Sequence, residues 1–304
     1  MAKTVASGDG RWVHNGAQWA PGPMTRARHA PRVCSVYVML TVLAALWGAA
    51  AGLLVPRAAY RFSVEPEDAW RDACPAGHAL TGAARGWLGS TRCAMCAAAV
   101  PVPAAPGAEP GDRSGGEDTA RPVARYAPGA LVPVVTALAC AVLAAATGLR
   151  PELAVWLLLA PVGVLLATID RRVHRLPDRL TLPAAGAVVV LLGVAALLPE
   201  HGGSWLSALL GGAALGAFYF LLFLINPNGM GFGDVKLALS LGAALGWYGW
   251  AVVFAGGFAG FLLGAVYGFG LMVLKRAGRK TGIPFGPFMI TGALLGILLG
   301  GLAA

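Results

Sequence analysis

Between Arg179 and Glu200 the chain reads LTLPAAGAVVVLLGVAALLP, residues 180–199, without a single charged side chain. A helix of about 20 apolar residues is long enough to cross the hydrocarbon core of a bilayer. Because the bilayer core offers no water to satisfy the backbone, a helix is the form in which such a single segment can cross. This stretch therefore predicts a transmembrane helix.

Charged residues divide the rest of the chain in the same way. Of six further uncharged runs, five suit a single span. The sixth, between Lys236 and Lys275, holds 38 residues and contains Trp247-Tyr248-Gly249-Trp250, aromatic residues that favour the headgroup level, so we divide it there. The sequence predicts eight spans, near 35–56, 128–148, 152–169, 180–198, 205–225, 234–248, 251–274 and 284–303.

The composition agrees with this division. Hydrophobic residues make up 57% of the 304 residues and charged residues 12%, whereas an ordinary soluble domain is about 25% charged. So few charges cannot cover a water-facing surface, which excludes a soluble enzyme, a coiled coil and a disordered protein. We expect an all-α polytopic membrane protein. Its net charge of +9 reports topology in the lipid bilayer and indicates no nucleic acid partner.

The chain is predicted to have four parts. Residues 1–33 lack apolar periodicity and are expected to be a disordered tail, and 34–56 form the first transmembrane helix. Residues 57–127 form a large loop with a Cys/His cluster, followed from Pro101 by a flexible linker rich in Ala, Pro and Gly. Residues 128–304 form the helix bundle. The first span could instead be a cleaved signal peptide, but its uncharged run exceeds the usual 7–15 residues.

Lysine and arginine positions predict the orientation in the membrane. The loops after spans 1, 3, 5 and 7 carry 8, 4, 1 and 4 of these residues, which is 17 of 23, and the opposite side carries the remaining 6. The positive-inside rule therefore places the odd loops in the cytoplasm and both termini outside. The basic N-terminal tail opposes this orientation, and the four loops carry the prediction.

Acidic residues near the spans are few. Glu152 and Glu200 fall in short outer loops, where solvation would account for them. Asp170 ends the third span and Asp234 opens the sixth, so both are expected at the cytoplasmic edge. A carboxylate at such a site is costly and needs a reason. The glycines before Asp234, Gly231 and Gly233, allow a tight bend and the close approach of another chain.

Two carboxylates that meet in a partly dry site cannot both ionise freely. One can activate a water molecule while its protonated partner protonates a leaving amine. The alternative is structural: each aspartate pairs with a nearby arginine or with Lys236 and caps a helix. Spacing alone leaves both interpretations open.

The motifs around these aspartates resemble a known family. Gly231-Phe232-Gly233-Asp234-Val235-Lys236 is similar to the GxGD motif of the type IV prepilin peptidases. The stretch from Asp170 to Pro177-Asp178 resembles their other aspartate motif, 64 positions upstream, and Ile283-Pro284-Phe285-Gly286-Pro287-Phe288 resembles their C-terminal signature.

The resemblance implies an aspartic endopeptidase with Asp170 and Asp234 as catalytic residues. Its substrates would be pilin-like precursors, whose short basic leader is removed at the cytoplasmic face of the bacterial inner membrane. Some members also methylate the new N-terminus with S-adenosylmethionine. Asp178 is expected to order its loop or to cap the fourth span, and Lys236 either acts on the charge of Asp234 or snorkels to the interface.

The cysteines also resemble the family, in which two CxxC pairs in the first loop bind zinc. Cys93-Ala94-Met95-Cys96 is an intact pair, whereas Cys74-Pro75-Ala76-Gly77-His78 has Gly77 in place of the second cysteine and His78 one position later. Three thiolates and one imidazole make a sound tetrahedral zinc site. A structural zinc is therefore expected on Cys74, His78, Cys93 and Cys96. The alternative is a decayed site, and the altered pair leaves methylation open.

Three other functions stay open. The chain could be another GxGD intramembrane protease of the preflagellin type, which a different substrate leader would distinguish. It could be a transporter that uses Asp170 and Asp234 as proton carriers, which would give flux without proteolysis. It could also be a non-catalytic assembly subunit, in which replacing either aspartate would leave function intact.

Overall fold

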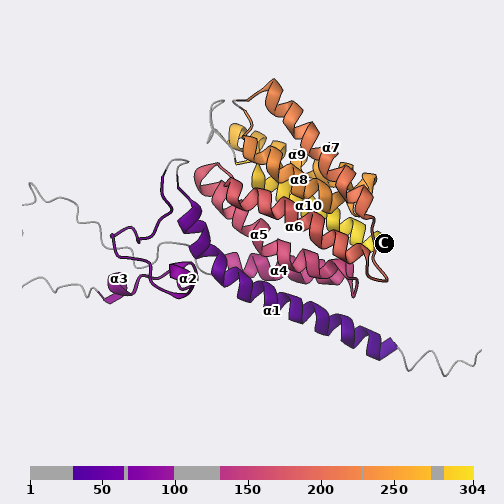
Figure 1. Ribbon diagram of the computed structural model, residues 1–304, viewed down its shortest axis with the longest axis horizontal. Helices are drawn as coiled ribbons and strands as arrows, with labels where there is room; N and C mark the ends of the chain where they lie inside the picture. The colour runs from indigo at the N-terminus through magenta and orange to yellow at the C-terminus, as the bar shows by residue number, and fades with distance from the viewer. Residues whose placement is uncertain (1–29, 65–67, 99–130, 228, 275–283) are drawn as a thin grey trace, which may run out of the picture. The chain divides into compact units, whose positions relative to one another are not determined.

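The computed structural model describes residues 30–64, 68–98, 131–227, 229–274 and 284–304. These residues form helices and loops, with one isolated β-bridge between Ala73 and Ala79. Of the predicted disordered tail 1–33, residues 1–29 lie outside the described residues, as does the predicted linker 101–125, whereas residues 30–33 belong to the first helix, so disorder was wrongly predicted for them. The helices are α1 (Ala30–Phe62), α2 (Ala83–Gly86), α3 (Ala94–Ala98), α4 (Leu131–Thr147), α5 (Glu152–Val173), α6 (Asp178–Ala196), α7 (Trp205–Ile225), α8 (Phe232–Gly246), α9 (Trp250–Val273) and α10 (Gly286–Ala303) (Figure 1).

Each of the eight predicted spans corresponds to one long helix, which confirms the all-helical membrane fold. By length and composition, six of these helices could cross a membrane: α1, α5, α6, α7, α9 and α10. The other two are shorter, with 17 residues in α4 and 15 in α8. The predicted boundary at Trp247-Tyr248-Gly249-Trp250 is also confirmed, because Gly249 has a positive φ of 101° and separates α8 from α9.

The contacts divide the chain into two units, 1–39 and 40–304. Of the first unit, the structure describes the opening turns of α1. The rest of α1 belongs to the second unit, where Ala44 packs with Cys140, Ala144 and Leu153 of α4 and α5. The helix continues to Phe62, beyond the predicted end at residue 56, because Arg57 and Arg61 are buried at 4% and 8% exposure instead of marking a solvated helix end.

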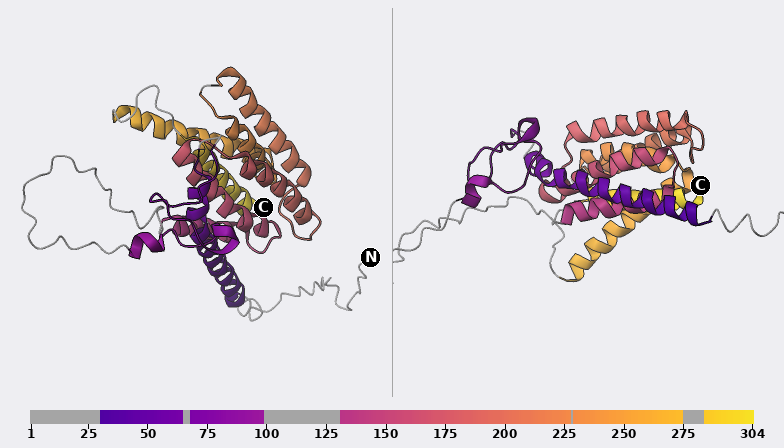
Figure 2. Two further views of the ribbon diagram at one scale, coloured as in Figure 1. Left: turned by 60° about the vertical axis from the view of Figure 1, so that its left-hand side comes forward. Right: turned by 90° about the horizontal axis from the view of Figure 1, so that it is seen from below.

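The other long helices of the second unit, α4 to α10, pack side by side (Figure 2). Small residues permit the closest contacts, as in membrane helices generally. A Cβ atom built on Gly242 of α8 would lie 2.5 Å from the carbonyl oxygen of Gly211 in α7, so neither helix could come this close with a larger residue there. Towards its C-terminal end, α9 diverges from its neighbours (Figure 2).

The prediction for Glu152 was wrong. This residue is fully buried and is not solvated in an outer loop. Its carboxylate accepts a hydrogen bond from the backbone N–H of Gly202 at 3.0 Å and lies 4.0 Å from the guanidinium of Arg150. Glu152 is the first residue of α5, where the helix dipole also favours a negative charge.

Candidate active site and metal centre

Asp170 and Asp234 come from two different helices and line one cavity. Asp170 lies in the last turn of α5, and Asp234 lies in the first turn of α8, where the helix dipole favours its charge. They are 4% and 8% exposed, so both carboxyl groups are removed from most of the solvent. The cavity that both residues line has a volume of about 490 Å³.

Backbone groups hold both aspartates in place. The N–H of Gly286, at the start of α10, donates to Oδ2 of Asp170 at 2.9 Å. A Cβ atom on Gly286 would lie 2.8 Å from that oxygen, so this close approach requires glycine. The N–H of Asp234 donates to the carbonyl of Gly231 at 3.0 Å. A Cβ atom on Gly233 would lie 2.9 Å from that of Leu176, so this glycine of the motif also lets the α5–α6 loop approach α8.

Asp178 and Lys236 form an ion pair beside the aspartates. The Nζ atom of Lys236 lies 2.6 Å from Oδ1 of Asp178, and both residues line the same cavity as Asp170 and Asp234. Asp178 is the first residue of α6 and follows the N-cap residue Pro177, so it does not occupy the capping position. Its observed contact is therefore with Lys236, and this contact ties the α5–α6 loop to α8.

Apolar packing supports the site from the side of the bundle. Leu166 of α5, Tyr219 of α7, Leu237 of α8 and Met289 of α10 belong to one buried cluster. Tyr219 is 1% exposed and stacks on Phe261 at 5.4 Å between ring centroids. Tyr219 was not singled out from the sequence, and Gly286 was named only as part of the C-terminal signature.

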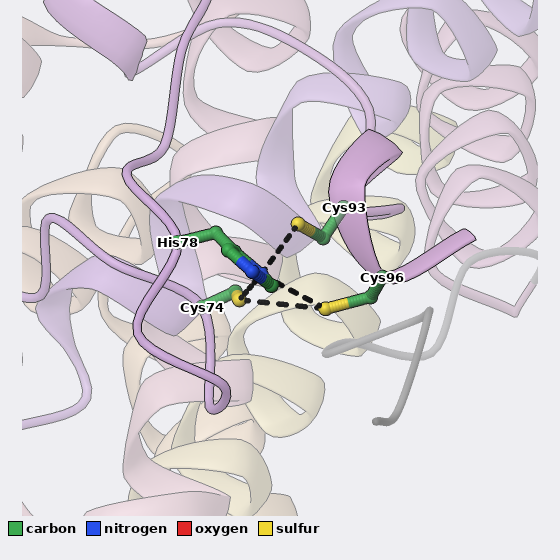
Figure 3. A group of neighbouring side chains, drawn as sticks. All are labelled: Cys74, His78, Cys93 and Cys96. Atoms are coloured by element: carbon green, nitrogen blue, oxygen red, sulfur yellow. Dashed lines mark hydrogen bonds between the residues drawn. The ribbon is translucent and has the colours of Figure 1, made fainter. Parts of the chain in front are cut away.

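The four predicted metal ligands converge on one point (Figure 3). Cys74 and His78 come from the loop after α1, and Cys93 and Cys96 come from the start of α3. The ligand atoms of all four lie within 4.8 Å of one another. Nδ1 of His78 lies 3.6 Å from the sulfur of Cys74, 3.7 Å from that of Cys93 and 3.3 Å from that of Cys96. The sulfur atoms of Cys74 and Cys96 lie 3.8 Å apart.

These distances fit a single metal ion with tetrahedral coordination. Zn–S bonds of about 2.3 Å and a Zn–N bond of about 2.0 Å at tetrahedral angles place sulfur atoms roughly 3.8 Å apart and sulfur roughly 3.5 Å from nitrogen. The Cys74–Cys96 separation of 3.8 Å and the sulfur–Nδ1 separations of 3.3 to 3.7 Å are near these values, and the other sulfur pairs lie within 4.8 Å. The altered first pair therefore retains a complete set of four donors, with Nδ1 of the histidine in the place of the fourth thiolate.

The local backbone explains how His78 replaces a cysteine one position later. The N–H of Cys74 donates to the carbonyl of His78 at 2.8 Å, and the N–H of Gly77 donates to the carbonyl of Cys74 at 2.9 Å. Gly77 has a φ of 81°, which glycine adopts without strain. The turn brings His78 back opposite Cys74, so the one additional residue between the two ligands fits within the turn.

The thiols of Cys93 and Cys96 lie in different environments. The backbone N–H of Cys96 faces Cys93 and lowers the pKa of the Cys93 thiol to about 7, which favours the thiolate that a metal requires. Burial raises the pKa of the Cys96 thiol to about 12. A bound cation would favour deprotonation of both thiols.

Two buried arginines fasten the cysteine-bearing segment to the end of α1. Arg57 donates to the carbonyl of Thr81 at 2.6 Å, and Arg61 donates to that of Arg85 at 3.2 Å and lies 4.2 Å from the ring centroid of Trp87. Gly89 gives Arg57 its space, since a Cβ atom there would meet the guanidinium nitrogen at 2.1 Å. Gly89 is thus needed for the close packing of this segment against α1.

The family to which this site points is found by comparison with known proteins. Residues 157–269 match the type IV leader peptidase family. This range contains Asp170, Asp178, the GxGD motif and Lys236, so the resemblance indicated by the motifs is confirmed. The cysteine-bearing segment and α10 lie outside the matched range. No solved structure is detectably similar to the chain.

Curated relatives carry the name prepilin leader peptidase/N-methyltransferase. The relative from Aeromonas salmonicida (strain A449) is 37% identical over 147 residues, which is 47% of this chain and 48% of that protein. The relative from Pseudomonas putida is 34% identical over 173 residues, 56% of this chain and 58% of that protein. That from Escherichia coli (strain K12) is 28% identical over 178 residues, 57% of this chain and 76% of that protein. The chain thus spans about half the length of the first of these relatives.

Proposed function

We propose that this chain is a membrane aspartic endopeptidase that removes the short basic leader of pilin-like precursors. The observation that carries the proposal is the meeting of Asp170 and Asp234, buried at the ends of two different helices, in one cavity within the segment that matches the leader peptidase family. The names of the relatives support the substrate class.

The two carboxyl groups suit peptide hydrolysis by an acid–base pair. One carboxylate takes a proton from water as the water attacks the scissile carbonyl, and the protonated partner donates its proton to the carbonyl oxygen. The first carboxyl group then passes the proton it took from water to the leaving amine as the C–N bond breaks. The pair shares its protons, so the roles belong to the pair and are not assigned to either residue. Gly286 holds Asp170 through its N–H, and the Lys236–Asp178 ion pair fixes the wall of the cavity.

Co-expression with a pilin-like precursor tests this function directly. The precursor should lose its leader in the presence of this chain, as measured by the mass of the mature N-terminus. Cleavage after a different leader sequence would favour the preflagellin type of protease. Ion flux without cleavage would favour the transporter, and full function of variants lacking either aspartate would favour the assembly subunit.

We place the active site at the cytoplasmic face of the bacterial inner membrane. The 17-to-6 distribution of Lys and Arg supports this orientation. Labelling of single introduced cysteines should find the loops 57–127, 170–179 and 275–283 accessible from the cytoplasm, with 199–204 as the matched external control. An external 275–283 loop would overturn the topology; the structure of that loop lies outside the described residues.

Replacing Gly286 should weaken cleavage without affecting membrane insertion. The added Cβ atom of Gly286→Ala would lie 2.8 Å from Oδ2 of Asp170 and displace the carboxyl group. Overpacking of this kind costs about 1–3 kcal/mol, so the initial rate of leader removal should fall roughly five- to hundred-fold. Gly270→Ala is the matched control, because no atom lies within 4 Å of its added Cβ. Equal rates for the two variants would contradict the role of the Gly286 contact.

We also propose that the metal held by Cys74, His78, Cys93 and Cys96 is a structural zinc ion. Four protein donors would fill the four positions of a tetrahedral zinc site and leave none open for a substrate. Zinc would close the segment 74–96, which is too small to build a core of its own.

N-methylation of the new N-terminus is the second candidate function. It is supported by the name of the relatives. S-adenosylmethionine would supply the methyl group. A mature N-terminus that carries one additional methyl group when S-adenosylmethionine is present would support this activity, and an unmodified N-terminus after complete cleavage would exclude it.

A further inference from the structure

The cysteine-bearing segment contacts the start of α6, beside the aspartate site. The guanidinium of Arg179, in the first turn of α6, lies 5.0 Å from the ring centroid of Trp70. Trp70 lies four residues before the metal ligand Cys74, and Arg179 directly follows Asp178. Cation–π pairs of this geometry are attractive even where they are partly exposed.

Trp70, the partner on the side of the metal-binding segment, is held by several interactions. Trp70 meets Trp87 at 5.3 Å and Phe62 at 5.3 Å between ring centroids. Trp87 belongs to the segment that the four ligands close, between His78 and Cys93. The N–H of Arg71 donates to the carbonyl of Arg61 at 3.3 Å, which holds the chain next to Trp70 against the end of α1. The position of Trp70 therefore depends on the closed form of the metal-binding segment.

The other side of the contact leads to the aspartates. Asp178 lines both the cavity of about 280 Å³ beside Trp70 and the cavity that holds Asp170 and Asp234. It is tied at 2.6 Å to Lys236, which is two residues beyond Asp234 on α8. Arg175, Leu176 and Asp178 line both cavities and thus form a wall that the two cavities share. A displacement of Arg179 would move this wall.

We infer that Trp70 and Arg179 are positioning residues through which the metal-binding segment sets the geometry of the aspartate site. The inference rests on the proposed function for its effect on cleavage, but the contact itself can be tested apart from activity. When the metal is removed, the segment loosens, Trp70 loses its support from Trp87, and the α5–α6 loop is less restrained.

The experiment uses the full chain in bilayers, with and without a zinc chelator. The first readout is hydrogen exchange of the backbone amides of residues 174–180. In the unmutated protein the chelator should raise exchange there, whereas in Trp70→Leu exchange should already be raised and the chelator should add little. An equal effect of the chelator in both proteins would overturn the inference, whether or not the chain cleaves any leader.

The second readout is leader removal from a pilin-like precursor. Trp70→Leu and Arg179→Gln should each lower kcat/KM by about two- to five-fold, and the double variant should be no slower than the slower single variant. Trp70→Phe and Arg179→Lys, which keep a ring and a cation, should recover most of the loss. Arg85→Gln is the matched control. Arg85 is an exposed arginine of the same segment, and its described contact is made by its backbone carbonyl, which the substitution keeps.

The outcomes separate this inference from the proposed function. Additive losses in the double variant, or no recovery with Trp70→Phe and Arg179→Lys, would overturn the coupling while leaving the peptidase intact. Absence of leader removal by the unmutated chain would contradict the proposed function, and hydrogen exchange would still decide whether the contact couples the two sites. Should Trp70→Leu fail to fold, Arg179→Gln tests the same contact from the α6 side.

Discussion

Asp170→Asn and Asp234→Asn should each abolish leader removal while leaving the protein inserted in the membrane. An amide has nearly the same shape as a carboxyl group, so the buried positions remain filled, but it can neither take a proton from water nor donate one to the leaving amine. Loss of an acid–base group costs on the order of 10²- to 10⁴-fold in rate. The measurement is the fraction of a co-expressed pilin-like precursor that retains its leader.

Asp178→Asn is the matched control for these variants. Asp178 lines the same cavity, but its side chain is 60% exposed and its contact is with Lys236. Exposed ion pairs contribute little, so this variant should retain clear activity. A dead Asp178→Asn together with an active Asp170→Asn would show that the catalytic pair has been assigned wrongly.

The helices and their order could be predicted from the sequence because charged residues cannot lie within the bilayer core at low cost. The same argument failed at the end of α1. There we took Arg57 as the boundary, but its guanidinium binds the carbonyl of Thr81, and Arg61 binds that of Arg85. A charged side chain marks the end of a helix only when water solvates it. The spacing of charges along the sequence does not distinguish a solvated side chain from one that binds a group far along the chain.

Glu152 illustrates the same limit from the opposite end of the bundle. Its position in a short connection predicted solvation, yet Gly202, fifty residues later, folds over it and donates a hydrogen bond. Gly286 provides the N–H for Asp170 across 116 residues of sequence. Such contacts depend on how helices meet in three dimensions, whereas the motifs around Asp170 and Asp234 could be recognised because their residues are adjacent in sequence.

The metal ligands were predictable for a related reason. Cys93 and Cys96 have the spacing of a ligand pair, and the resemblance to the family directed attention to Cys74. The replacement of a cysteine by His78 did not by itself show whether the site had decayed. The reversal of the chain at Gly77, which brings His78 opposite Cys74, is what gives Nδ1 its place among the sulfur atoms.

The purified chain should hold about one zinc ion, as expected for a four-ligand structural site. His78→Ala should lower the zinc content and make the segment 74–96 more sensitive to proteolysis, because three thiolates alone leave one coordination position without a protein ligand. Metal analysis of protein prepared without a chelator measures the first effect, and limited proteolysis measures the second. Leader removal should suffer less than in Asp170→Asn, since the metal lies outside the catalytic pair.

Cys140→Ala is the matched control for the metal site. Cys140 is a buried cysteine of α4 that packs against Ala44 and Ala144 and does not belong to the group of four ligands. Its replacement should leave the zinc content unchanged, so that loss of metal from His78→Ala can be attributed to the missing ligand. If the unmutated protein contains no zinc, the tetrahedral separations of Cys74, His78, Cys93 and Cys96 reflect packing alone. The coupling through Trp70 and Arg179 would then have no metal to depend on.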